Sequence, residues 1–179
     1  MYNKKGDVWI SAVLYFGLGI VVLSILLAAG LPVINKLRDK NVIIQTKQIM
    51  HELDQNIREV VKEGPGSQRV VTVNIKKGSF IVDEVNSMII WEYNGSKVLI
   101  SDPGIDVPEG KLNIRTDNAP QKNTYNVRVF IDYKEIAKLA RPQGKTSTLV
   151  GINDLVIRNQ GVDPQNPKVV TVSVTETNK

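Results

Sequence analysis

The chain has 179 residues, no cysteine, a single histidine and a formal net charge of +5 at pH 7. Without cysteine it can form no disulfide, thiolate nucleophile or cysteine-ligated metal site, and one histidine excludes a multi-histidine metal site. The basic residues are spread along the sequence rather than gathered in a dense cluster with aromatic platforms. We therefore expect no nucleic-acid partner.

Residues 8–35 contain no charged side chain, and this apolar stretch is the most informative feature of the sequence. About 20 apolar residues are enough to cross a bilayer as a helix. The stretch therefore predicts a helix that spans a membrane or is buried in another apolar medium. Gly30 and Pro32 weaken helical hydrogen bonding near its end, so we expect a kink there.

Residues 36–63 are abruptly polar but keep a helical pattern. Their apolar positions form a seam with alternating spacings of three and four residues, which is typical of an amphipathic helix. The members of this seam are Ile43, Met50, Leu53, Ile57 and Val60, with Thr46 in one further slot. A seam this short favours a helix lying on its own domain over a coiled coil. Gly64-Pro65-Gly66 predicts the end of the helix.

From residue 69 onward the pattern changes to alternation of apolar and polar residues with many β-branched side chains, which predicts strands. The expected strands are 70–75, 80–82, 88–93, 97–100, 111–115, 125–131, either 149–150 or 155–157, and 169–174. Asn94-Gly95 predicts a tight hairpin turn, Lys77-Gly78 a second turn, and residues 133–140 a short helix.

These elements predict an α+β fold, in which a long apolar helix continues into an amphipathic helix and then into a mainly antiparallel β-domain. The expected domains are a basic head over 1–6, the apolar helix over 7–35, the amphipathic helix and linker over 36–66, and the β-domain over 67–179. The β-domain is large enough to bury a core of its own.

No group of residues in the sequence predicts catalysis, a cofactor or a metal. Gly144-Lys145-Thr146 copies the end of a phosphate-binding loop, but Leu139 stands where the first glycine is required. The acidic pairs Asp83-Glu84 and Asp102 with Asp106 are interpreted as turn formers rather than calcium ligands. His51, the only histidine, is interpreted as a structural or surface residue, so we expect no enzyme.

Asn94 belongs to Asn94-Gly95-Ser96, the only acceptor sequence for N-glycosylation in the chain. The same Asn-Gly pair is also what a type I′ turn requires. We favour the turn as its main role and keep Asn94 as a possible glycosylation site.

The basic head and the helix order resemble archaeal type IV pilin-like proteins with a class III signal peptide. The match is carried by Lys4, Lys5, Gly6 and Asp7 directly before the apolar helix. The specific motif covers only these first residues, whereas the layout of helices and β-domain covers the whole chain. Ser11 departs from bacterial relatives, in which a glutamate is common at this position.

The resemblance implies that a prepilin-type peptidase cleaves between Gly6 and Asp7 on the cytoplasmic side. The precursor would rest in the lipid bilayer. The mature chain would join pilus assembly machinery and form a homo-oligomeric cell-surface filament through its N-terminal helices. The β-domain would then lie outside the cell, available for adhesion. Charge alone leaves the orientation open, because Lys36, Arg38 and Lys40 flank the other end of the apolar stretch.

Two other interpretations remain open from the sequence. In the first, the helix is a permanent single-span anchor and the β-domain is an extracytoplasmic binding or sensor module that does not polymerise. In the second, the chain is an ordinary secreted protein cleaved near Ala28-Ala29-Gly30, although the apolar region is long for a removable signal. For surface contact, the loops over 102–110 and 159–167 are the candidates, since loops carry recognition on rigid scaffolds.

Overall fold

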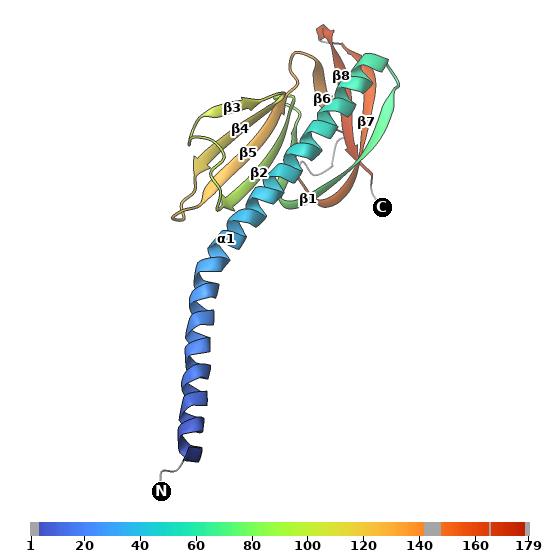
Figure 1. Ribbon diagram of the computed structural model, residues 1–179. Coiled ribbons are helices and arrows are strands. Elements are labelled where there is room, and N and C mark those ends of the chain that lie inside the picture. Colours follow the sequence, from blue (N-terminus) through green and yellow to red (C-terminus); the bar gives the residue numbers. More distant parts are fainter. Residues whose placement is uncertain (1–3, 142–147, 165, 178–179) are drawn as a thin grey trace. The chain divides into compact units, whose positions relative to one another are not determined.

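The computed structural model describes residues 4–141, 148–164 and 166–177 (Figure 1). Within these ranges, one helix, α1 (Lys4–Glu63), is followed by eight strands that form a single sheet. The strands are β1 (Gln68–Asp83), β2 (Met88–Ser96), β3 (Asp106–Glu109), β4 (Leu112–Asn118), β5 (Tyr125–Asp132), β6 (Ala137–Ala140), β7 (Thr148–Asp163) and β8 (Asn166–Glu176). The α+β class and the order of helix before sheet confirm the prediction from the sequence.

The chain divides into two compact units, Met1–Arg38 and Asp39–Lys179. The first contains the apolar part of α1, and the second contains the amphipathic part together with the whole sheet. Residues Gly30 and Pro32 are helical, so neither of them ends α1. The kink expected there stays a prediction.

The sheet has the order β3-β4-β5-β2-β1-β7-β8-β6. Each neighbouring pair is antiparallel except β6 and β8, which are parallel. β1 lies in the middle of this order and pairs with both β2 and β7, while the β3–β4–β5–β2 half and the β7–β8 hairpin flank the amphipathic part of α1 (Figure 1). The arrangement gives the helix a continuous apolar surface to cover.

The core of the second unit lies between α1 and the inner face of the sheet. On the helix, the predicted seam is buried, since Ile43, Met50, Leu53, Ile57 and Val60 are each at most 1% exposed. On the sheet, the fully buried side chains include Trp91, Phe80, Ile89, Leu155 and Ile157. The seam therefore packs on the domain of the same chain, as predicted.

The turn predicted at Lys77-Gly78 is wrong, because β1 continues through these residues. The register of β1 against β7 shifts between Ile75 and Phe80, which marks an irregularity in the ladder. Gly78 lies in this irregularity with a φ of 78°. A glycine can adopt this left-handed conformation without strain, so the strand passes through a bulge instead of ending.

The hairpin predicted at Asn94-Gly95 is also wrong. Both residues lie inside β2, and the register of β2 against β5 shifts between Tyr93 and Ser96. Gly95 has a φ of 80°, so its left-handed conformation serves a bulge near the end of β2 rather than a type I′ turn. The residues expected to form the second strand of that hairpin, 97–100, are irregular.

Three further predictions need correction. Residues 133–140 form a turn followed by β6 rather than a helix. The loop expected over 102–110 contains β3, and the two alternative strands expected after residue 148 both belong to β7. The Gly144-Lys145-Thr146 segment lies outside the described residues. The segments 102–110 and 148–163 contain glycine, proline, asparagine or aspartate, which are typical of turns, so local pattern alone does not assign them to strands.

We predict that Leu53→Ala destabilises the second unit by about 2–5 kcal/mol, because it leaves a cavity where the helix meets the sheet. Leu53 is 0% exposed, whereas Ile44 on the same helix is 41% exposed and provides a matched control as Ile44→Ala. Thermal unfolding of the full chain in a mild detergent, followed by circular dichroism, measures both. Equal effects of the two substitutions would contradict the packing described here.

We also predict that Gly78→Ala lowers the unfolding temperature more than Gly95→Ala. Both glycines have a positive φ, so alanine is strained at either position. A Cβ at Gly78 would in addition collide with the Glu92 carbonyl oxygen and come within 2.8 Å of the Trp91 indole nitrogen, whereas Gly95 has open space. The difference between the two variants in the same thermal experiment isolates this collision.

Candidate functional site

The first candidate is the apolar part of α1. Its described side chains from Trp9 to Arg38 are exposed, with only Gly30 half-buried. The large apolar members include Trp9, Phe16 and Leu26, which are 76%, 73% and 63% exposed. By length and composition, α1 is able to cross a membrane and so to anchor the chain in one.

The predicted processing residues Lys4, Lys5, Gly6 and Asp7 are the first residues of α1. They immediately precede the exposed apolar segment, so the peptide bond between Gly6 and Asp7 lies at its N-terminal end. The cleavage itself stays a prediction.

The second candidate is a buried acidic group where the amphipathic part of α1 begins. Asp39 is 4% exposed and accepts three hydrogen bonds. The donors are the Tyr93 hydroxyl at 2.7 Å, the Lys77 ammonium at 2.9 Å and the Lys97 backbone N–H at 2.9 Å. These donors come from β2, from β1 and from the irregular segment after β2, so one carboxylate joins the helix to three parts of the β-domain.

Two opposing effects set the pKa of Asp39. Burial disfavours the charged form, but the Lys97 N–H, the Lys77 ammonium and the Tyr93 hydroxyl outweigh it and hold the pKa below its usual value. Reciprocally, the hydrogen bond to Asp39, followed by the one to Tyr93, raises the pKa of Lys77. The Lys77 ammonium also lies 5.4 Å from the centre of the Tyr93 ring, close enough for a cation–π contact. The group is a charged anchor rather than a proton-transfer site.

The irregularity at Gly78 helps to position this anchor. The Trp91 indole N–H donates to the Lys77 carbonyl at 2.9 Å, which fixes the backbone of Lys77 beside β2. The missing side chain at Gly78 leaves room for that contact. The bulge therefore places the Lys77 ammonium against Asp39.

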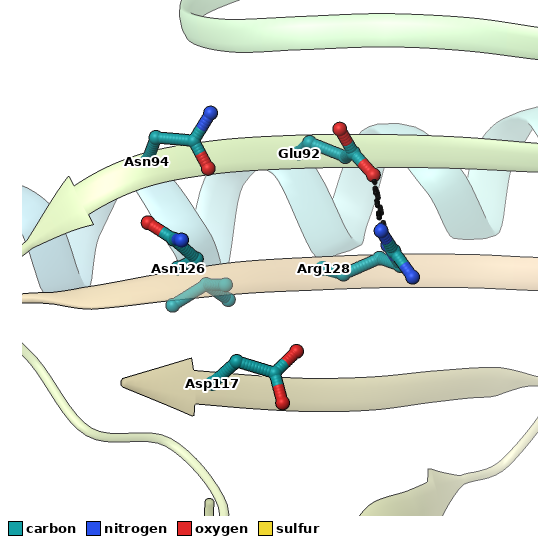
Figure 2. A pocket seen from close by; sticks show the side chains of 6 residues that line it. Glu92, Asn94, Asp117, Asn126 and Arg128 are labelled. Carbon is teal, nitrogen blue, oxygen red and sulfur yellow. Dashed lines mark hydrogen bonds and ion pairs between the residues drawn. The ribbon is translucent and has the colours of Figure 1, made fainter. Parts of the chain in front are cut away.

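The third candidate is a pocket on the outer face of the sheet, with a volume of about 110 Å³. Figure 2 shows Glu92 and Asn94 on β2, Asn126 and Arg128 on β5, and Asp117 on β4, all on the same side of these strands. The Arg128 guanidinium donates to the Glu92 carboxylate at 2.8 Å. Sequence reasoning missed this pocket, because it assigned Asn94 to a turn after the strand 88–93 and could not tell which strands pair.

Asn94, the possible glycosylation site, is exposed at the rim of this pocket. Ser96, the hydroxyl residue of the same acceptor sequence, is 0% exposed, and its hydroxyl bonds the backbone of Val98. A glycan on Asn94 therefore has space in the folded chain, whereas the hydroxyl that a modifying enzyme must reach does not face solvent.

Two of the carboxylates considered from the sequence, Asp83 and Asp106, have structural partners. Asp83 accepts hydrogen bonds from the Asn86 backbone and side chain, which confirms it as a turn former, and these bonds lower its pKa. Asp106 pairs with Arg115 at 3.3 Å, and His51 is exposed on α1. Within the described ranges, no group of three or more histidine, aspartate or glutamate side chains is arranged to hold a metal ion.

The two segments proposed as loops for surface contact are largely strand, since 106–109 form β3, 159–163 belong to β7 and 166–167 belong to β8. Glu109 forms an ion pair with Lys47 of α1 at 2.7 Å. Asn159 is 1% exposed and donates to the Val60 carbonyl of α1 at 3.0 Å. Parts of both segments therefore hold the sheet to the helix, although residues 102–110 are exposed throughout.

Comparisons of the chain with protein-family models, with curated proteins and with solved structures found no match.

We predict that Asp39→Asn destabilises the second unit by about 1–3 kcal/mol at neutral pH, since it weakens the bonds of a buried charged acceptor. Because the pKa of Asp39 is lowered on folding, its contribution is complete above the unfolded pKa of 3.8. The contribution is lost as the pH falls through the still lower folded pKa. The difference in unfolding temperature between the parent chain and Asp39→Asn should therefore shrink below about pH 4.

The matched control is Asp102→Asn, which makes the same change at an exposed carboxylate. It should leave the unfolding temperature nearly unchanged at every pH. A pH-independent difference between Asp39→Asn and the parent chain would show that the loss is due to packing and not to charge.

Proposed function

We propose that the chain is a structural subunit, a major or minor pilin, of an archaeal type IV pilus-like surface filament. In this proposal it is inserted in the membrane as a precursor, cleaved after Gly6 and assembled through its N-terminal helix. The β-domain then faces outward for adhesion or surface contact. The observation that carries the proposal is the long apolar helix whose side chains are exposed on all sides.

Exposure of this segment to water would be unfavourable, because buried apolar surface contributes roughly 25 cal/mol per Å². A helix rises about 1.5 Å per residue, so the uncharged stretch is longer than the roughly 30 Å hydrocarbon core of a bilayer. Both a membrane and a bundle of identical helices provide the required apolar surroundings. The same apolar helix can therefore lie first in the membrane and later in a bundle of identical helices.

The helix also has features that suit packing against copies of itself. It carries no charge from Val8 to Asn35, so a bundle of copies buries no unpaired ion over this length. At Gly17 and Gly19, a Cβ would meet nothing within 4 Å, which leaves space for another backbone to approach. These properties support assembly but are also compatible with a lone anchor.

The second unit fits the role of an outer coat. Its core is complete without the apolar segment, since the seam residues of α1 are buried against its own sheet. The core of the domain therefore does not depend on the apolar segment. In the alternative proposal, the same two parts make a membrane-anchored binding module that does not polymerise.

We predict that the native protein begins at Asp7, which intact-mass measurement of material purified from its own cells can decide. Gly6→Val should block cleavage, retain the head and abolish filaments, while the chain still enters the membrane. Asp102→Asn, at an exposed position in the β-domain, is the control and should be processed normally. A native chain that starts at Met1 would contradict the proposal.

Filament formation itself needs a second measurement. Material sheared from the cell surface should contain filaments in electron micrographs and peptides of this chain by mass spectrometry. Cleaved chains that mild detergent extracts as discrete particles, with no sheared filaments, would favour the anchored module instead.

A further inference from the structure

The outer face of β2, β5 and β4 contains two adjacent pockets that share the Glu92–Arg128 pair. The first, of about 110 Å³, includes Asn94, Asn126 and Asp117. The second, of about 310 Å³, extends over the neighbouring positions of the same strands and reaches β3. Together they form one polar surface that the core of the domain does not use.

One row of charges crosses four strands in register. Glu92 lies opposite Arg128, Arg128 opposite Arg115, and Arg115 opposite Asp106. Arg128 is 2.7 Å from Glu92, and Arg115 is 3.3 Å from Asp106. Each guanidinium in the row therefore has an acidic partner, so the surface presents charged groups without a large excess of either sign.

A second row contains amides next to a carboxylate. Asn126 lies opposite Asp117, and Asn94 lies across the same pocket (Figure 2). Among the described residues, neither the Asn94 nor the Asn126 side chain makes a hydrogen bond. The Asp117 carboxylate is itself paired with the Arg115 guanidinium at 3.1 Å. The two amides without partners therefore supply the free donors and acceptors of this row.

The backbone of this surface is already paired. β2 is bonded to β1 and β5, and β5 is bonded to β2 and β4. Over the residues that pair on both sides, a peptide cannot add to these strands by extending the sheet, because no edge is free there. Any ligand must be recognised through side chains.

Next to the charged row lies an apolar row. Ile90 and Phe130 face each other across β2 and β5, are half-buried, and line the second pocket. They provide a small apolar platform beside the paired charges and the amides.

We infer that this surface, comprising the pocket residues Glu92, Asn94, Asp117, Asn126 and Arg128 with the platform of Ile90 and Phe130, binds a neutral saccharide. Vicinal hydroxyl groups act as donors and acceptors together, which matches carboxylate, guanidinium and amide groups at one site. The C–H face of a sugar ring covers an apolar platform. A strongly anionic ligand would face the carboxylates, and a cation would face the guanidinium groups.

This inference names the chemistry of the outward contact included in the proposed function, but it does not require a filament. A non-polymerising anchored domain would present the same surface. Failure to find filaments and failure to find saccharide binding are therefore separate results.

The test is an array of neutral and acidic glycans, probed with the full chain in a detergent that has no sugar headgroup. The parent chain should bind a subset of neutral glycans. Asn126→Ala and Arg128→Ala should each weaken binding about tenfold or more, as expected for loss of one or two hydrogen bonds. Asn74→Ala, at an exposed position of β1 away from the pockets, is the matched control and should bind within about twofold of the parent.

Circular dichroism melting curves for each variant ensure that a loss of binding is not a loss of fold. If Arg128→Ala lowers the melting temperature, the binding of Arg128→Lys and Asn126→Ala decides the test instead. The Asn126 side chain makes no hydrogen bond within the described part of the domain, so its removal should not affect the fold. No binding by the parent chain, preference for acidic glycans, or equal binding by parent and variants would each overturn the inference. Peptide mapping that finds Asn94 fully glycosylated in the native protein would also overturn it, since the attached glycan would occupy the pocket.

Discussion

The amphipathic helix and the sheet share one apolar interface, and the rest of the second unit depends on it. The seam from Ile43 to Val60 supplies one side, and Trp91, Phe80 and their neighbours supply the other. Along the same helix, the described side chains from Trp9 to Arg38 are exposed, apart from the half-buried Gly30. One continuous helix therefore has two different environments. Its second part packs in the hydrophobic core of the second unit, and its first part requires apolar surroundings. The change between them occurs within a few residues.

Asp39 is the first residue of the second unit, directly after this change. A buried carboxylate is unfavourable unless its oxygens are bonded, and here three donors meet it. The donors fix one helical residue against β1, β2 and the segment after β2. An apolar residue at this position would extend the hydrophobic surface, but it would form no hydrogen bond that fixes this point of the helix against the sheet. The charged anchor therefore adds directional bonds at one position of the helix, which an apolar seam does not provide.

The sequence was sufficient for features that repeat along the chain. The burial of the seam was predictable because helical periodicity places Ile43, Met50 and Leu53 on one face. The helix over residues 8–35 was predictable because a long uncharged stretch is typical of a membrane-spanning helix. Asn94-Gly95 misled because a glycine with positive φ serves a bulge as well as a turn, and only the pairing partner distinguishes them. Asp39 gave no signal within its own polar neighbourhood, since its partners are 38, 54 and 58 residues away in the sequence. The outer pocket was missed for a similar reason, because its strands β2 and β5 pair although β3 and β4 separate them in the sequence.

The inner and outer surfaces of the domain are linked through strand β2. Side chains alternate between the two faces of a strand, so Trp91 and Tyr93 face the helix when Glu92 and Asn94 face outward. The inner pair builds the core and the Asp39 anchor. The outer pair enters the pocket, where Glu92 bonds Arg128 of the neighbouring strand. The bulge at Gly95 lies directly after Asn94, so the pocket ends where regular pairing is interrupted. Because a shift of one residue in β2 would exchange these faces, the register that seats the helix also determines which polar side chains the domain presents to its surroundings.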